Sequence, residues 1–343
     1  MIPYWLLYLL PAGLTLARVP ITPRVGGFLA LVLVAAIGLR YEVGGDWVAY
    51  IGYLLRAEQL TLLEIVVQQD PGYYLVNWLS ASFGFQVWFV NVVCAALFVG
   101  GLLAFVRRLP DPMLALTAAM PYLVTVVAMG YTRQAVALGL ALFALVALAD
   151  RSTGRFLLWI AAAVTFHKSA VLLVPLAVLA GSRDRLTTIV AVAATTGVLF
   201  VLFLADHTDH LWHHYVESDY AMAAQGGVIR VAMNAVPAVL LILWLRRFPM
   251  SQDQRTLWFA VAVLALVCVP LVFQAPTAVD RIALYLIPLQ LVVAGYLPAL
   301  VVPEQRAAIR FAVVAYSAAV LFVWLNFANH AFVWLPYRFW LFE

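Results

Sequence analysis

The chain alternates between long apolar segments and short polar ones. Apolar runs that could cross a bilayer cover roughly 3–18, 25–41, 86–106, 112–129, 132–149, 155–167, 168–182, 187–205, 229–245, 256–273, 280–301 and 309–328. A perpendicular membrane helix needs about 20 residues, so the shorter runs must be tilted, kinked or enclosed in a bundle. The segment 72–84 is too short and too polar to span a membrane. The pattern predicts an all-α, polytopic transmembrane bundle of about 12 spans, with short outer-face helices and re-entrant loops.

The polar segments do not divide the chain into separate domains. No internal repeat, low-complexity stretch or linker interrupts the runs, so we treat residues 1–343 as one integral membrane domain. Residues 41–85 are expected to form an outer loop with interfacial or re-entrant helices, and residues 206–228 a second outer loop. Only His167 and Lys168 separate runs 155–167 and 168–182, so this boundary is the least distinct.

Composition supports the membrane class. The 343 residues are 66% hydrophobic and 10% charged, with a mean hydropathy of +1.00. A soluble domain carries about 25% charged residues, because its surface must be solvated. The net charge of +4 would suggest a nucleic-acid partner in a soluble protein. In a membrane protein it is better explained by the excess of Lys and Arg in cytoplasmic loops.

The basic residues orient the chain. With an outer N-terminus, thirteen of the 20 basic residues fall in six alternate loops, each with at least two. Cytoplasmic loops show this excess of Lys and Arg. Eleven of the 16 acidic residues and all 6 histidines then lie on the outer side. The pattern therefore predicts that both termini are outside.

Five outer cations lie at or near the ends of apolar runs, where topology gives no reason for them: Arg40, Arg133, Lys168, Arg230 and Arg281. A charge at membrane depth costs about 2.5–3.5 kcal/mol even on insertion scales, so such residues usually have a function. Each one alone could extend to the lipid headgroups. Because five gather on one face, we predict that they converge on an anionic ligand. The planar guanidinium group of Arg suits phosphate.

Seven motifs carry a family resemblance. They occur in the order RYEVGGDWVAY (40–50), DPGYYLVNWL (70–79), YTRQAVALGLAL (131–142), FHKSAVLLVPL (166–176), GGVIR (226–230), DRIALY (280–285) and WLPY (334–337). Together they resemble the EpsG family of bacterial exopolysaccharide polymerases, distant relatives of Wzy-type O-antigen polymerases, over nearly the whole chain. No single motif is specific. One departs from the family pattern, because Asp70 stands where a glutamate is more usual, although the carboxylate and the turn are kept.

The resemblance implies a Wzy-like membrane polysaccharide polymerase. Such an enzyme would transfer a glycan from an undecaprenyl-diphosphate donor to another lipid-linked repeat unit, at the periplasmic face of the bacterial inner membrane. The partners it implies are polyprenyl-diphosphate-linked oligosaccharides and membrane lipid, with a flippase and a chain-length regulator as candidate protein partners. No nucleotide sugar, cofactor or nucleic acid is expected. Fixed cations can stabilise the charge that develops on the leaving diphosphate, and a base can accept the proton of the attacking hydroxyl.

The motifs also assign roles to residues. Asp46 and His167 are the candidate catalytic bases, and the five outer cations are the candidate diphosphate ligands. A surface ion pair between Asp46 and Arg40 is an equally good interpretation of the first motif, because ion pairs commonly orient phosphate-binding arginines. The candidate sugar ligands are Trp47, Tyr50, Asp70, Tyr73, Gln134, Asp280, Tyr285 and Tyr337, although an interfacial aromatic belt explains such aromatic residues equally well.

A histidine-rich segment raises the question of a metal. Residues 206–214 contain four histidines and two aspartates, namely Asp206, His207, Asp209, His210, His213 and His214. Their spacing would suit one face of a helix and could ligate a metal. The expected transfer needs none, so no metal site is predicted.

Two other function classes fit part of the pattern. A GT-C-like glycosyltransferase that uses a polyprenyl-phosphate sugar would also need an outer acid and phosphate-binding arginines, and only the motif order favours the polymerase. A lipid-linked oligosaccharide flippase should carry ionisable residues at mid-membrane and broken helices. Here the charges gather at one face instead, which favours chemistry at the membrane surface.

Overall fold

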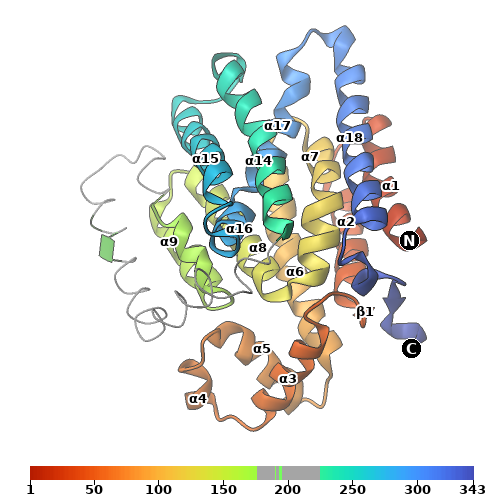
Figure 1. The fold of residues 1–343 in the computed structure, drawn as a ribbon, viewed down its shortest axis with the longest axis vertical. Helices are drawn as coiled ribbons and strands as arrows, with labels where there is room; N and C mark the ends of the chain where they lie inside the picture. Colours follow the sequence, from red (N-terminus) through yellow and green to blue (C-terminus); the bar gives the residue numbers. More distant parts are fainter. Residues whose placement is uncertain (176–189, 191–192, 195–224) are drawn as a thin grey trace.

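The structure is a computed structural model that describes residues 1–175, 190, 193–194 and 225–343. It is a bundle of helices with a group of short helices at one end (Figure 1). The N-terminal part forms α1 (Ile2–Leu16), α2 (Pro23–Gly38), β1 (Arg40–Tyr41), α3 (Trp47–Glu58), α4 (Leu62–Val66), α5 (Pro71–Ser82), α6 (Val87–Val106), α7 (Pro112–Ala119), the π-helix η1 (Met120–Ala128), α8 (Thr132–Ala149), α9 (Thr153–Val164) and the 3-10 helix η2 (Lys168–Leu173).

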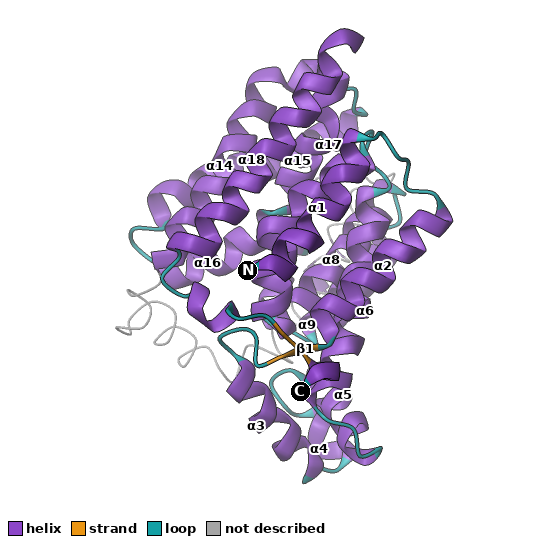
Figure 2. Cartoon of the chain, turned by 90° about the vertical axis from the view of Figure 1, so that its right-hand side faces the viewer, coloured by secondary structure: helices purple, strands orange, loops and turns teal. Residues whose placement is uncertain are grey.

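The C-terminal part completes the bundle. It forms α14 (Gln225–Trp244), η5 (Leu245–Arg247), α15 (Gln252–Leu271), α16 (Pro276–Leu286), α17 (Pro288–Tyr296), η6 (Leu297–Leu300), η7 (Pro303–Gln305), α18 (Arg306–Phe327), η8 (Ala331–Trp334), β2 (Arg338–Phe339) and η9 (Trp340–Phe342). The strands β1 and β2 pair antiparallel, so the C-terminal segment lies beside the end of α2 (Figure 2).

Apolar helices occupy ten of the expected apolar runs. Within the described residues, 6 helical segments are long and apolar enough to cross a membrane, and four shorter apolar helices accompany them. The expected spans 168–182 and 187–205 lie largely outside the described residues. The protein is therefore a membrane-embedded helical bundle, and the full number of spans stays a prediction.

Local sequence explains where many helices begin. Proline stands in the first turn of α1, α2, α5, α7, α16 and α17, where it loses no hydrogen bond and its φ is already helical. The side chains of Thr22, Asp111 and Ser251 accept backbone N–H groups at the starts of α2, α7 and α15. The run 280–301 accordingly forms two helices, because α17 starts afresh at Pro288.

The centre of the bundle depends on close packing between α6 and α8. A Cβ atom on Gly101 would lie 1.9 Å from the carbonyl oxygen of Gly139, and one on Gly139 would lie 2.4 Å from Cα of Phe98. Small residues at such contacts let membrane helices approach backbone to backbone. By contrast, α14 and α18 expose large apolar side chains such as Leu243 and Phe311, as expected for helices that face lipid.

The helices α3, α4 and α5 lie together at one end of the bundle (Figure 1). The expected outer loop 41–85 therefore folds largely into short helices, and α5 covers most of segment 72–84. At this end α8 begins and α9 finishes, because Gly72 N donates to Thr165 O just beyond α9, and Arg133 in the first turn of α8 contacts Asp70. We call it the site end.

Candidate functional site

The site end collects most of the chemically active residues that the sequence singles out. Asp46 precedes α3, Asp70 precedes α5, Arg133 lies in the first turn of α8, and His167 follows α9. Arg281, on α16, is close enough to influence both Asp46 and His167 electrostatically. Five segments that are distant in sequence thus meet at one place.

A tight turn places Asp46 in this group. Gly44 has φ +103°, and a Cβ atom there would lie 2.5 Å from the carbonyl oxygen of Met129. Only glycine combines this backbone conformation with so close an approach. Gly44 N donates to Val333 O at 2.9 Å, which joins the turn to the C-terminal segment. Gly44 therefore provides both the turn and the close backbone approach.

Asp46 has one carboxylate oxygen held by the protein and one without a described donor. The Tyr50 hydroxyl accepts the backbone N–H of Thr132 at 2.7 Å, and it shares its one proton between Oδ2 and the carbonyl oxygen of Gly130, each at 3.3 Å. Burial raises the pKa of Asp46 above its usual range, and the nearby charges of Arg133, Arg281 and Arg40 partly oppose this shift. A half-buried carboxylate with a raised pKa is a better proton acceptor than an exposed one.

The ion pair between Arg133 and Asp70 forms a second part of the site. Nη1 of Arg133 donates to Oδ2 of Asp70 at 2.6 Å, and the guanidinium lies 4.7 Å from the centre of the Tyr53 ring. Burial raises the pKa of Asp70, while Arg133 and Lys168 act to lower it. The Asp70 side chain is almost buried and the Arg133 side chain is 26% exposed. This geometry holds the guanidinium in place while part of it stays accessible.

Two cationic nitrogens near this pair have no hydrogen-bond partner in the described part of the chain. Nζ of Lys168 and Nε of Arg281 are both buried, and neither has a hydrogen-bond partner among the residues that the structure describes. An unpaired buried cationic group is costly, because it loses its hydration without compensation. Together with Arg133, these groups make the site end electropositive and suited to an anion.

His167 is held as a neutral side chain. Nε2 of Gln134 lies 3.2 Å from Nε2 of His167, and Oγ of Ser169 lies 2.5 Å from Nδ1. An amide nitrogen can only donate, so with this amide orientation His167 accepts at Nε2 and carries its proton on Nδ1. Burial lowers the pKa of His167 well below its usual range, and the charges of Arg281, Arg133 and Lys168 lower it further. Its one basic lone pair is therefore already engaged.

Arg230, on α14, forms an ion pair with Asp280, the residue before Arg281. Its Nη1 lies 2.7 Å from Oδ2 of Asp280, and its Nε donates to the Tyr122 hydroxyl at 2.5 Å. Both charged side chains are largely buried. Arg230 is thus neutralised by Asp280, whereas Arg281, the next residue on α16, has no such ion pair in the described part of the chain.

Arg40 differs from the other four cations. It is fully buried, and its guanidinium donates to the carbonyl oxygens of Ile37 and Val43 and to the side chains of Asn91 and Thr132. The expected alternative of a surface ion pair between Asp46 and Arg40 is wrong, because the Arg40 side chain is fully buried and its guanidinium donates to other groups. These contacts tie α2 to α6 and α8 and give Arg40 a structural role.

The aromatic candidates for sugar binding lie mostly inside the protein. Trp47, Tyr50, Tyr73 and Tyr285 are all buried, which leaves little ring face for a sugar. Tyr337 is half-buried and donates to Ala36 O at 2.8 Å. In this structure the rings pack around the polar groups of the site. Their burial does not support sugar stacking, which stays a prediction.

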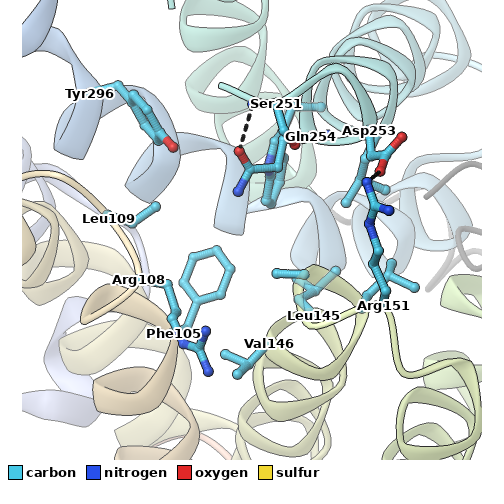
Figure 3. A pocket seen from close by; sticks show the side chains of 14 residues that line it. Phe105, Arg108, Leu109, Leu145, Val146, Arg151, Ser251, Asp253, Gln254 and Tyr296 are labelled. Atoms are coloured by element: carbon cyan, nitrogen blue, oxygen red, sulfur yellow. Dashed lines mark hydrogen bonds and ion pairs between the residues drawn. The ribbon is translucent and has the colours of Figure 1, made fainter. Parts of the chain in front are cut away.

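A small cavity at the opposite end of the bundle is a weaker candidate for the site. It measures about 70 Å³ and lies among Arg108, Leu145, Arg151 and Asp253 (Figure 3). Its charged groups already pair within the protein, with Arg151 Nη2 2.6 Å from Asp253 Oδ2. The charged side chains that line this cavity therefore have partners within the protein.

Metal ligands do not gather in the described residues. Residues 1–175 and 225–343 contain no group of three or more His, Cys, Asp or Glu side chains arranged to hold a metal. The histidine-rich segment 206–214 lies outside the described residues, so its function stays open.

Comparison with known proteins gives the family. The sequence model of the EpsG family matches residues 24–339, nearly the whole chain. The chain belongs to the EpsG family. The family expected from the seven motifs is thereby confirmed, and no curated protein or solved structure gives a significant match. Membership of the EpsG family indicates a polysaccharide polymerase, a glycosyltransferase kind of activity, in a membrane-embedded protein.

Sequence reasoning missed several residues of this EpsG-family site. Tyr53 faces Arg133, Tyr122 binds Arg230, and Ser169 binds His167. Asn91 was also overlooked, although an amide within an apolar run is a signal of an internal hydrogen bond. The other three look like ordinary aromatic or small polar residues in sequence, and only the fold places them beside a charge.

Proposed function

We propose that this EpsG-family protein polymerises glycans at the site end, which we assign to the periplasmic face of the bacterial inner membrane. The donor is a glycan on undecaprenyl diphosphate, and the acceptor is the sugar hydroxyl of another lipid-linked repeat unit. The observation that supports this most directly is the pair of unpartnered cationic nitrogens, on Lys168 and Arg281, beside Arg133. A diphosphate would supply the negative charge that these groups lack.

The residues present can account for the transfer. The acceptor oxygen forms a bond to the anomeric carbon as the bond from that carbon to the diphosphate oxygen breaks, and the electron pair of that bond leaves with the diphosphate. Arg133, Lys168 and Arg281 stabilise the charge that develops on the leaving group. Asp46 accepts the hydroxyl proton, because one of its oxygens has no described donor, whereas both ring nitrogens of His167 lie within hydrogen-bond distance of protein groups, namely Gln134 and Ser169.

A reconstituted reaction tests this proposal. Purified protein in liposomes, given only the lipid-diphosphate-linked repeat unit, should yield longer lipid-linked glycans. Transfer of single sugars from a polyprenyl phosphate would instead support the GT-C-like alternative, and translocation without new bonds would support a flippase. A flippase and a chain-length regulator are proposed partners, and neither should be required for bond formation in this assay.

Arg281→Lys gives the sharper form of the test. The variant keeps the charge but loses the planar, multiple-donor geometry. Loss of one hydrogen bond to a charged group costs about 1.5–3 kcal/mol, so polymerisation should fall about 10- to 100-fold. Arg56→Lys is the matched control, because Arg56 is exposed on α3 at the same end. If Arg281→Lys polymerises as well as the control variant, this arginine does not bind the diphosphate.

A further inference from the structure

A large apolar groove lies in the part of the bundle that spans the membrane, and Tyr122 marks the end of the groove that is nearer to the site end. It has a volume of about 290 Å³ and lies between α14, α17 and α18, with Pro121 and Tyr122 of η1 on a further side. Most of its surface is apolar, and the polar side chain of Gln290 is turned to Asn234, to which it donates at 2.6 Å. The groove therefore suits a hydrocarbon rather than a sugar.

The groove opens on the outside of the bundle. Val236 of α14 and Tyr316 of α18 line it and are 57% and 53% exposed. Both helices belong to candidate membrane spans. An opening between them faces the lipid, so a hydrocarbon chain could enter sideways without passing through water. Pro237, within α14, also lines the groove and removes one backbone hydrogen bond of that helix.

One end of the groove lies next to the ion pair of Arg230 with Asp280. Tyr122 lines the groove, and the hydroxyl of the same side chain accepts the hydrogen bond from Nε of Arg230 at 2.5 Å. Met233, one helical turn from Arg230 along α14, also lines the groove. Arg230 pairs with Asp280, whose neighbour Arg281 has no described partner. One end of the apolar surface thus lies a single side chain, that of Tyr122, away from Arg230.

We propose that this groove, the tail groove, holds the isoprenoid chain of the lipid-diphosphate substrate while the diphosphate lies at the cationic groups. This inference rests on the proposed function, because it takes the substrate to be an isoprenoid diphosphate. A bilayer acyl chain is the competing occupant. The isoprenoid is favoured because the Tyr122 end of the groove lies beside Arg230, whose partner Asp280 precedes Arg281 on α16, and Nε of Arg281 has no described partner. A diphosphate head could therefore reach a cation while its isoprenoid chain lies in the groove.

The contribution of the groove to substrate binding depends on the free energy of moving the isoprenoid chain from the bilayer into it. Lipid tails are as apolar as the groove, so transfer of the isoprenoid chain from the bilayer gains little hydrophobic free energy. Its contribution is packing and orientation, which hold the diphosphate and the anomeric carbon in line with Asp46. The groove should therefore affect substrates with long chains and leave those with short chains unaffected.

The test compares two donors and two variants. Ala312 lies on α18, lines the groove and is exposed to lipid, so Ala312→Trp should obstruct the groove without disturbing the core. Ala315→Trp is the matched control, because Ala315 is exposed on the same helix but does not line the groove. With an undecaprenyl-diphosphate donor, Ala312→Trp should reduce polymerisation about tenfold relative to the control, or about 1.4 kcal/mol. With a farnesyl-diphosphate donor the two variants should be equal.

A binding measurement separates this inference from the proposed function. Undecaprenyl diphosphate without sugar should raise the thermal unfolding midpoint of wild type and Ala315→Trp in detergent, and raise that of Ala312→Trp less. This result would support the tail groove even if no donor were polymerised, an outcome that would overturn the proposed function alone. Equal shifts in both variants, or equal loss with both donors, would overturn the groove as the tail site.

Discussion

Asp46 and Arg40 come from the same motif, yet the structure gives them different surroundings. Arg40 is enclosed, with its donors bound to Ile37 O, Val43 O, Asn91 and Thr132, whereas Asp46 keeps a carboxylate oxygen that no described residue contacts. The sequence alone could not distinguish them, because burial and donor use depend on where α6 and α8 pass. The free carboxylate oxygen of Asp46 therefore favours a role in the reaction, whereas the fully hydrogen-bonded guanidinium of Arg40 favours a role in stability.

The structural role of Arg40 predicts an effect on stability. Arg40→Lys keeps the charge but cannot reach all four acceptors. Leaving a buried acceptor unsatisfied costs about 1–3 kcal/mol. The thermal unfolding midpoint in detergent should therefore fall clearly. Arg338→Lys is the control, since Arg338 pairs with Glu42 at an exposed position and exposed pairs contribute about 0–1 kcal/mol. Unchanged stability with lost donor binding would instead make Arg40 a substrate ligand.

The proposed role of Asp46 predicts a selective loss of turnover. A positioned base contributes about 10²–10⁴-fold, so Asp46→Asn should lower polymerisation by about that factor while donor binding is retained. His167→Gln should lower it less, because the basic nitrogen of His167 is already engaged by Gln134. Turnover in liposomes and binding of the sugar-free lipid diphosphate measure the two quantities separately. The assignment is lost if Asp46→Asn turns over normally.

The pH profile provides an independent readout of the same residue. Burial raises the pKa of Asp46, so the reactive carboxylate is lost as pH falls through a value above the usual 3.8. Polymerisation should therefore start to decline at a higher pH than an ordinary aspartate would give. The pKa of His167 is lowered, so this group stays neutral over the same range, and His167→Gln should keep the acidic decline. A profile that loses its acidic decline in His167→Gln would reassign the base.

At the scale of elements, the Gly44 turn fixes the start of α3 against the end of η1. The turn contacts Met129 and Gly130, and Val333 accepts its backbone N–H. Gly44→Ala should destabilise the protein by at least about 1–3 kcal/mol, because alanine resists positive φ and its Cβ would meet the Met129 carbonyl. Gly45→Ala is the matched control, since nothing lies within 4 Å of a Cβ there. Thermal unfolding should separate the variants, and equal midpoints would show that the turn can relax.

The elements themselves were largely predictable from the sequence. Length and apolarity are strong signals, and α6, α8, α15 and α18 lie within a few residues of the expected runs. The end of α9 at Val164 was harder to predict, because the expected apolar run extends to His167 and only His167 and Lys168 separate it from the next run. Which helix ends meet could not be predicted, since every span is apolar on most faces. The ion pair of Arg133 with Asp70 and the burial of Tyr73 follow from that packing alone.

At the scale of the whole molecule, charge gathers at the two ends of the bundle in different ways. At the end opposite the site, Arg108 pairs with Asp150 and Arg151 with Asp253 on accessible surfaces, while the pair of Arg310 with Asp111 is partly buried. At the site end, Arg133 and Arg230 pair in partly or fully buried positions, and Lys168 and Arg281 lack described partners. Nε of Arg255 at the opposite end is also unpaired, but Nη2 of the same guanidinium donates to Phe248 O. No described hydrogen bond engages the charged group of Lys168 or Arg281, and buried charges without any partner indicate a ligand.

The proposed orientation can be tested by labelling single cysteines in intact spheroplasts. Glu58→Cys and Glu343→Cys are exposed positions at the site end and should react with an impermeant thiol reagent. Arg247→Cys and Gln305→Cys are exposed at the opposite end and should react only after the membrane is opened. Both native cysteines are buried, which keeps the background low, and a permeant reagent should label all four variants. The reverse pattern would place the site end in the cytoplasm, where the flipped lipid-linked donor is absent, and the polymerase proposal would then lose its substrate.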